Sequence, residues 1–102
     1  MNSKALSLAG MARRANKVSL GHDACEGSVK NGCASLVIVS NDASERLKEE
    51  MSGLCKAYNT DFCEFDCSKS ELGASLGAKI TAVFSINDAG FAKRIIELIR
   101  EE

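Results

Sequence analysis

The chain has 102 residues and a mass of 10.9 kDa, which suits one domain spanning residues 1–102. Apolar residues make up 45% and charged residues 26%, a globular balance that excludes a disordered or collagen-like chain. Thirteen lysines and arginines oppose fourteen acidic residues, so the net charge of -1 does not itself indicate nucleic-acid binding. The longest apolar run, Leu36–Val39, is far shorter than a membrane span, and no signal-peptide core is visible. We expect a cytoplasmic protein that does not bind membranes.

Apolar periodicity predicts alternating helices and strands in the N-terminal half. An apolar residue recurs every three or four positions over residues 3–14, which predicts an amphipathic helix. Residues 17–20 form a very short strand candidate, after which the chain turns into a second helix that Asp23 would cap. The β-branched run Leu36–Val39 is typical of a strand covered on both faces.

The C-terminal half repeats this alternation. Ser44 begins a helix whose apolar stripe places Cys55 in the core and extends to Tyr58. The remaining patterns predict, in chain order, a strand at Phe62–Phe65, a short helix opened by the capping-box pair Ser68 and Glu71 and closed at Gly77, a strand at Ile80–Ile86 and a last helix that begins at Asp88. The fold class is therefore α/β, with helices on both faces of one sheet; strand order and sense stay open.

Five cysteines are many for this length: Cys25, Cys33, Cys55, Cys63 and Cys67. An odd number of thiols without an export signal argues against a secreted disulfide scaffold. No Cys-x-x-Cys pair occurs and the single imidazole lies far away in sequence, so a zinc or redox site is the least favoured reading and we expect no metal. Most of these thiols should be small core residues.

Groups suited to catalysis are sparse. The one histidine, His22, follows Gly21 at a turn without a visible thiol or carboxylate partner. Neither a dinucleotide-binding glycine motif nor a lysine-bearing phosphate loop occurs, because Gly73 and Gly77 follow a helix and do not open one. We therefore expect no catalytic residue, no small-molecule cofactor and no enzyme.

The turn at Gly21, His22 and Asp23 can bind a folded RNA, or it can be an ordinary turn that begins a helix. Taken alone, these residues support the two interpretations equally. Glycine allows close backbone approach, a helix N-terminus offers N–H donors, and a carboxylate accepts from base amino groups. Residues 1–34 carry five basic against two acidic residues, whereas residues 35–102 carry eight against twelve. Further candidate RNA-binding residues are Arg13, Arg14, Lys17, Lys30, Asn41, Asp42 and Lys79.

These residues stand in a longer pattern that resembles the bacterial YlxQ-type branch of the ribosomal protein L7Ae and L30e superfamily. The pattern covers residues 8–17 (LAGMARRANK), Gly21, residues 29–44 (VKNGCASLVIVSNDAS), residues 71–77 (ELGASLG) and residues 87–93 (NDAGFAK). The resemblance implies a three-layer α/β/α sandwich around a four-stranded mixed sheet. It also implies binding of structured RNA, in some members kink-turns, and a gene setting among transcription-termination and translation-initiation factors.

The helix-start motif of this family departs from the pattern here. Gly-x-Asn-Glu-x-x-Lys falls on residues 21–27, where only Gly21 is kept and Asp23, Ala24 and Gly27 replace the amide, carboxylate and cation. Each lost base contact costs about 1 to 3 kcal/mol, so kink-turn preference is less secure than RNA binding in general. The resemblance also places Asn41-Asp42 and the small loop Ala78-Lys79-Ile80 at the RNA site.

The leading hypothesis is a non-enzymatic protein that binds structured RNA, ribosomal RNA in the first place, and works with the ribosome or the translation and transcription machinery. The main alternative is a protein-interaction module whose RNA site has decayed and whose acidic part binds a ribosomal or transcription-factor protein. A thiolate zinc or redox protein is a distant third.

Overall fold

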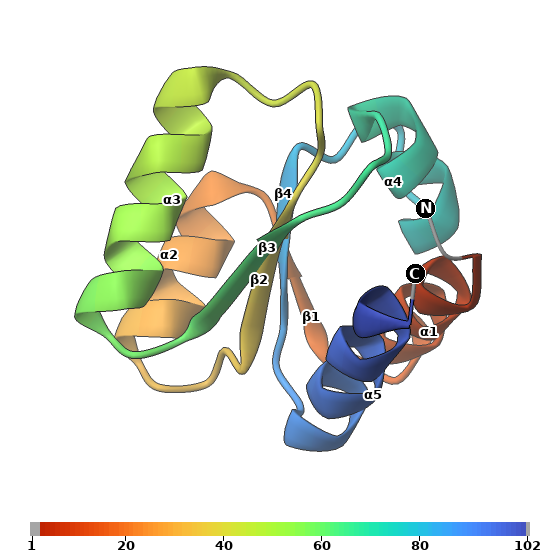
Figure 1. Ribbon diagram of the computed structural model, residues 1–102, viewed down its shortest axis with the longest axis horizontal. Coiled ribbons are helices and arrows are strands. Elements are labelled where there is room, and N and C mark those ends of the chain that lie inside the picture. The colour runs from red at the N-terminus through yellow and green to blue at the C-terminus, as the bar shows by residue number, and fades with distance from the viewer. Residues whose placement is uncertain (1–2, 102) are drawn as a thin grey trace.

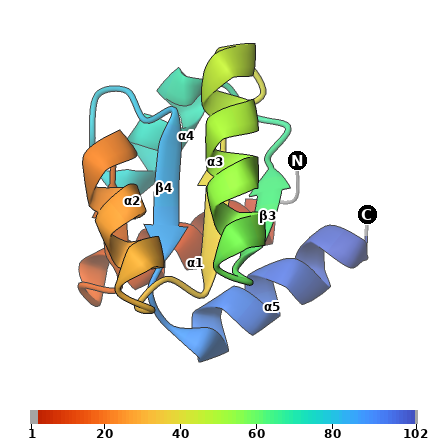
Figure 2. The same ribbon diagram turned by 90° about the vertical axis from the view of Figure 1, so that its left-hand side faces the viewer.

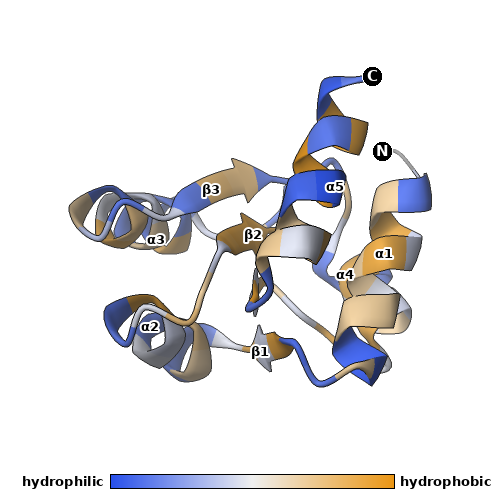
Figure 3. Cartoon of the chain, turned by 90° about the horizontal axis from the view of Figure 1, so that it is seen from below, coloured by the Kyte–Doolittle hydropathy of each residue, from blue (hydrophilic) through white to orange (hydrophobic). Residues whose placement is uncertain are grey.

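Each strand is followed along the chain by a helix, so the helices are available to cover the sheet (Figure 1). The computed structural model describes residues 3–101. Its elements are α1 (Ser3–Arg14), β1 (Val18–Leu20), α2 (His22–Lys30), β2 (Leu36–Val39), α3 (Glu45–Ala57), β3 (Asp61–Glu64), α4 (Lys69–Leu76), β4 (Val83–Ile86) and α5 (Ala89–Arg100). Figures 1 and 3 show α2 and α3 on one face of the sheet and α1, α4 and α5 on the other. The expected three-layer α/β/α sandwich is confirmed.

Side-chain alternation along the strands divides the apolar core between the two faces. In β2, Leu36 and Ile38 pack in the cluster below α1, α4 and α5, whereas Val37 and Val39 pack in the cluster below α2 and α3. All four residues of β2 are buried, as the unbroken apolar run predicts. Successive residues of a strand face opposite sides, so this one segment supplies both cores.

The sheet has the order β1-β4-β2-β3 and is mixed. Strand β4 runs antiparallel to both β1 and β2, while β2 and β3 are parallel. Strand β3 therefore forms one edge of the sheet, which Figure 2 shows next to the end of α5. The four-stranded mixed sheet that the resemblance implies is confirmed.

A chain of hydrogen bonds ties α2 to the sheet. The Ser19 and Ser28 hydroxyls lie 2.7 Å apart, and the Asn87 side-chain amide donates to Ser19 Oγ at 2.9 Å. Buried Ser85 in turn donates to Asn87 Oδ1 at 2.8 Å. Because each polar group has a partner, this network links α2, β1 and β4 without an unsatisfied buried hydroxyl among its members.

Two predicted boundaries are wrong in an informative way. The predicted strand Ile80–Ile86 begins only at Val83, because the backbone N–H of Ala78 donates to Gly73 and that of Thr81 donates to Lys69, which ties this segment to α4. The predicted cap Asp23 lies inside α2, whose N-cap is Gly21 in a positive-φ conformation (φ 89°). In contrast, Ser44, Ser68, Gly77 and Asp88 act as predicted helix ends.

Candidate nucleic-acid interface

One edge of the sandwich gathers the ends of all four strands. The Gly21 backbone N–H donates to Val83 O at 3.0 Å, so the end of β1 meets the start of β4. Ser40, after β2, donates to Ala82 O at 2.9 Å in the same way. We call this edge the rim and define it by residues 20–23, 40–42, 65–68 and 78–82. In Figure 2 it is the upper edge, at the tail of the β4 arrow.

The rim brings six of the ten predicted site residues to one edge: Gly21, His22, Asp23, Asn41, Asp42 and Lys79. The other four lie elsewhere. Lys17 precedes β1, where its carbonyl accepts from Asn87 N beyond the far end of β4, and Lys30 ends α2. Arg13 and Arg14 end α1. Lys17 and Lys30 thus lie at the opposite edge, because β1 and α2 separate them from the Gly21 turn.

A hollow of about 290 Å³ opens on the rim. It is mostly apolar and is lined by Leu20, Gly21, His22, Leu47, Ala78, Ile80, Thr81, Ala82 and Val83. Ile80 is 64% exposed, the most exposed of the large apolar residues in the described chain. Sequence reasoning named the loop of Ile80 but missed Leu47, whose α3 spacing marks it only as a core residue.

The hollow adjoins the N-terminus of α2. Gly21 caps this helix without a side chain, and among the described residues no side chain accepts from its first N–H groups. A Cβ at Gly21 would meet nothing within 4 Å, so the space in front of the helix is open. Free N–H groups and the helix dipole favour an anion at this position.

Carboxylates nevertheless approach the same turn. His22 Nε2 contacts Glu50 Oε1 on α3, and His22 Nδ1 lies 3.1 Å from Asp23 Oδ1. The hydrogen bond with Glu50, followed by that with Asp23, raises the pKa of His22 above 6.5. Glu50 was missed because a contact between two helices 28 residues apart leaves no local pattern in the sequence. The turn is thus a mixed surface of donors, one imidazole and two anions.

Glu50→Gln should lower the pKa of His22, because the amide cannot stabilise the imidazolium as a carboxylate does. A folded-state pKa above the unfolded value means that the contact stabilises the fold below about pH 6.5, and that this contribution is lost as pH rises through the folded-state pKa. NMR titration of the imidazole measures the shift. Glu49→Gln, one position away on α3, is the control; an equal shift in both variants would contradict the direct contact.

Asn41 and Asp42 hold the rim together. The Asn41 side-chain amide donates to Asp66 Oδ1 at 3.1 Å, and Asp42 Oδ1 accepts from the Lys69 backbone N–H at 2.9 Å. The neighbouring Ser40 hydroxyl and the Lys69 N–H lower the pKa of Asp42 below its ordinary value. Asp42 therefore stays ionised and anchors the start of α4 to the end of β2.

Lys79 sits in a loop that has little freedom to move. Ala78 N donates to Gly73 O at 2.7 Å, and a Cβ at Gly73 would lie only 2.7 Å from Lys79 O. Helix α4 and this loop thus touch backbone to backbone, which only glycine permits. The exposed Lys79 side chain therefore projects from a loop whose backbone is held against α4.

The cysteines are mostly structural. Cys25, Cys55 and Cys67 are buried, Cys63 is half-buried and Cys33 is exposed. Burial raises the pKa of Cys25 and Cys63 to about 12 and that of Cys55 to about 11, so these three thiols stay protonated at neutral pH. Within residues 3–101 no three histidine, cysteine or acidic side chains gather as metal ligands would. No helix in that range has the length and apolarity to span a bilayer.

Comparison with known proteins identifies the family to which this fold belongs. The ribosomal protein L7Ae/L30e/S12e/Gadd45 family matches residues 3–96. The chain belongs to this family. Two relatives carry the name RNA-binding protein YlxQ: that of Bacillus subtilis strain 168 is 33% identical over 90% of this chain and 91% of its own, and that of Enterococcus faecium is 38% identical over 94% and 91%.

Solved structures agree with the family assignment. A Bacillus halodurans protein of unknown function superposes with a TM-score of 0.90 at 32% identity, covering 95% of this chain and 97% of its own. A Giardia lamblia 15.5 kDa RNA-binding protein reaches a TM-score of 0.80 at 21% identity, covering 94% and 82%, and shares the fold. The family fold thus accounts for the order of strands that brings four strand ends to the rim.

Proposed function

We propose that the chain is a non-enzymatic RNA-binding protein that seats a structured RNA on the rim. The observation that carries the proposal is the apolar hollow of about 290 Å³ beside the open N-terminus of α2. The names of the two YlxQ relatives support RNA as the ligand. Ribosomal RNA is the proposed target, and a kink-turn is the RNA shape to test first.

The hollow and the N-terminus of α2 can bind different parts of one nucleotide. An unstacked base has an apolar face that can pack against Ile80 and Leu47, while the phosphate next to it can accept from the N–H groups at the start of α2. Asp23, whose side chain is fully exposed, can accept from a base amino group. Recognition then rests on the shape of a bent RNA that exposes a base.

Charge limits how the backbone of the RNA can approach. Asp23 and Glu50 repel phosphates near His22, and Lys48 is already paired with Glu64 at 3.2 Å. Lys79 is the rim cation that the sequence singled out. Arg13, Arg14, Lys17 and Lys30, which lie away from the rim, can contact phosphates only of an RNA long enough to extend past it.

Lys79→Ala should weaken binding of a short hairpin and reduce its salt slope by about one, because one phosphate contact is lost. Lys30→Ala is the matched control at the opposite edge and should leave that hairpin unaffected. Binding to total ribosomal RNA and to a kink-turn hairpin is measured between 50 and 200 mM salt. An absence of binding at low salt would overturn the proposal. Equal effects of both variants would show that the RNA does not bind at the rim.

Ile80→Ser should weaken RNA binding about threefold to tenfold, because a polar side chain cannot pack against the face of a base. Ile80 is largely exposed, so the free energy of unfolding should change little. Met11→Ser, which changes an apolar residue on α1 that is 48% exposed, is the control. Equal losses of affinity in the two variants would show that the base does not enter the hollow.

The carboxylates at the rim support one further candidate, a basic protein partner. Asp23 and Asp66 are exposed on the rim and Glu50 is exposed beside it on α3, and Asp23 and Glu50 both contact His22. A complex of the full chain that survives ribonuclease treatment and dissociates in the double variant Asp23→Asn and Glu50→Gln would favour this candidate over RNA.

A further inference from the structure

His22, the first residue of α2, is held between two carboxylates. Its Nε2 contacts Glu50 Oε1 on α3, and its Nδ1 lies 3.1 Å from Asp23 Oδ1 on the next residue. Both ring nitrogens are thus engaged, which orients the imidazole and stabilises its charged form. His22 also lines the apolar hollow of the rim. The nitrogen that contacts Glu50 therefore belongs to a side chain that an RNA in the hollow would touch.

The Glu50 carboxylate can leave His22 without disturbing the core. The side chains of His22 and Glu50 are 40% and 44% exposed, so water already reaches their contact. Arg46 precedes Glu50 by one helical turn and lies on the same face of α3. Arg46 forms no ion pair in the part of the chain that the structure describes. A Glu50 side chain that turns away from His22 can therefore pair with Arg46.

The other charged groups near His22 do not take the place of Glu50. On α2, Asp23 is engaged with the other ring nitrogen, and Glu26 forms an ion pair within the helix. Strands β1 and β4, which pack against α2, contain no charged residue. The loop after α4, which also lines the hollow, contributes the cation Lys79. Glu50 is thus the anion that α3 brings to Nε2 from outside α2.

We propose that Glu50 is an internal competitor of the RNA: its carboxylate contacts Nε2 of His22 in the free protein, and a phosphate of the RNA displaces it on binding. A phosphodiester and a carboxylate each carry one negative charge and accept from N–H donors, so one can replace the other at this nitrogen. Glu50 keeps the imidazole oriented before the RNA arrives but lowers the affinity by competition. Glu50 thus regulates the RNA site of the proposed function, on which this inference rests.

Glu50 also determines how strongly RNA binding depends on pH. Its contact raises the pKa of His22, so the wild-type imidazole is already largely charged below that pKa and exchanges one anion for another. In Glu50→Gln the pKa of the free protein falls, and the arriving phosphate raises it again. Binding then takes up a proton, so the affinity of this variant should fall more steeply than that of the wild type between about pH 6 and about pH 8.5.

The affinity of the full chain for the kink-turn hairpin is measured at about pH 6 and about 50 mM salt. Glu50→Gln should bind about fivefold more tightly than the wild type. Glu49→Gln makes the same change of charge about 100° further round α3 and should gain less than about twofold. Equal gains would overturn the proposal, because they would reflect net charge alone.

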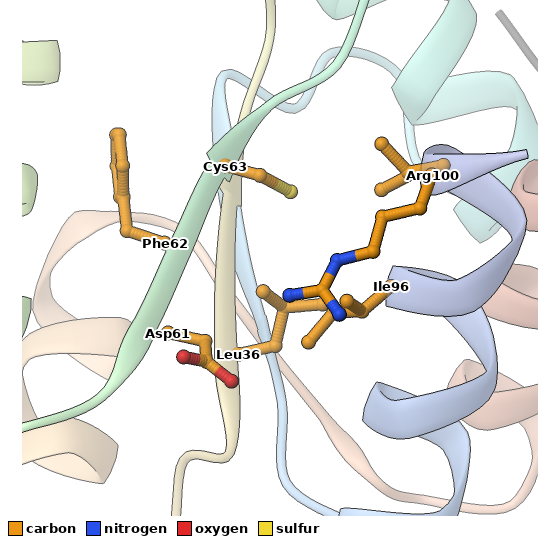
Figure 4. A pocket seen from close by; sticks show the side chains of 7 residues that line it. Leu36, Asp61, Phe62, Cys63, Ile96 and Arg100 are labelled. Atoms are coloured by element: carbon orange, nitrogen blue, oxygen red, sulfur yellow. The ribbon is translucent and has the colours of Figure 1, made fainter. Parts of the chain in front are cut away.

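A second charge control lies far from the rim. Asp61 lines a hollow of about 220 Å³ between β3 and α5, which Figure 4 shows together with Arg100. Asp61 begins β3 and pairs with Leu36 at the start of β2, so it lies at the edge of the sheet opposite to the rim. Asp61→Asn should leave the affinity for the hairpin within about twofold of the wild type.

A double-mutant cycle identifies His22 as the group through which Glu50 acts. In the His22→Ala background, Glu50→Gln should gain no more than Glu49→Gln, because no imidazole is left to release. His22→Ala should also flatten the pH dependence. A full gain of Glu50→Gln in that background, or equal pH profiles of Glu50→Gln and the wild type, would overturn the inference and leave RNA binding at the rim intact. An absence of binding by every variant would overturn the proposed function, and this inference with it.

Discussion

A Gly73→Ala variant is expected to lose both stability and RNA binding. The added Cβ would lie 2.7 Å from Lys79 O and 2.9 Å from Ile80 N, and neither backbone atom can rotate away as a side chain would. Overpacking of this kind costs about 1 to 3 kcal/mol. Relief requires the loop to move away from α4, which displaces Lys79 and Ile80 together and opens one side of the hollow.

Urea unfolding and hairpin binding of the Gly73→Ala variant are measured side by side. Gly53→Ala is the control, because Gly53 is exposed in α3 and a Cβ there meets nothing within 4 Å. That change should stabilise the chain by about 0.5 to 1 kcal/mol through helix propensity alone. Should Gly73→Ala bind RNA like the wild type, the proposed part of the loop in recognition would have to be abandoned.

Phe84→Ala is expected to give the largest loss of stability, about 3 to 5 kcal/mol. Phe84 is fully buried in β4 and contacts Phe65 edge to face, with ring centroids 6.4 Å apart. The truncation leaves a cavity in the larger core cluster and removes this aromatic contact. A domain of this size has only about 5 to 15 kcal/mol of stability, so the loss is a large fraction of the total.

Thermal and urea unfolding measure the effect of Phe84→Ala. Phe91→Ala is the matched control, since Phe91 on α5 is only partly buried and packs at the margin of the same cluster. Its loss should be clearly smaller. Comparable losses for the two variants would mean that the core around β4 collapses onto the cavity more fully than its packing suggests.

Local patterns predicted the secondary structure well where one interaction decides it. Leu36–Val39 is a buried strand because its side chains are apolar on both faces, and Ser68 begins α4 because its hydroxyl and the Glu71 side chain satisfy backbone N–H groups. The start of β4 was predicted wrongly. Ile80 has a strand-forming side chain, but its neighbours Ala78 and Thr81 bond to α4, a tertiary contact that propensity does not contain.

The candidate site was predictable only in part. Gly21, Asn41 and Lys79 follow or precede strands whose ends meet at one edge, and the alternation of elements suggests that meeting. Lys30 ends α2 as predicted but lies away from the rim, because nine helical residues carry the chain about 13 Å from Gly21. Glu50 was missed because its contact with His22 depends on how α2 and α3 pack together.

The position of β4 in the sheet has a consequence for biosynthesis. β4 is the last strand made, yet it lies between β1 and β2, and its Ile86 pairs with Leu36 about 50 residues earlier. A nascent chain that has not yet released β4 therefore holds β1 and β2 without their shared neighbour. The backbone groups of β2 that face β4 lack their strand partner until that late pairing, which favours a cooperative completion of the sheet.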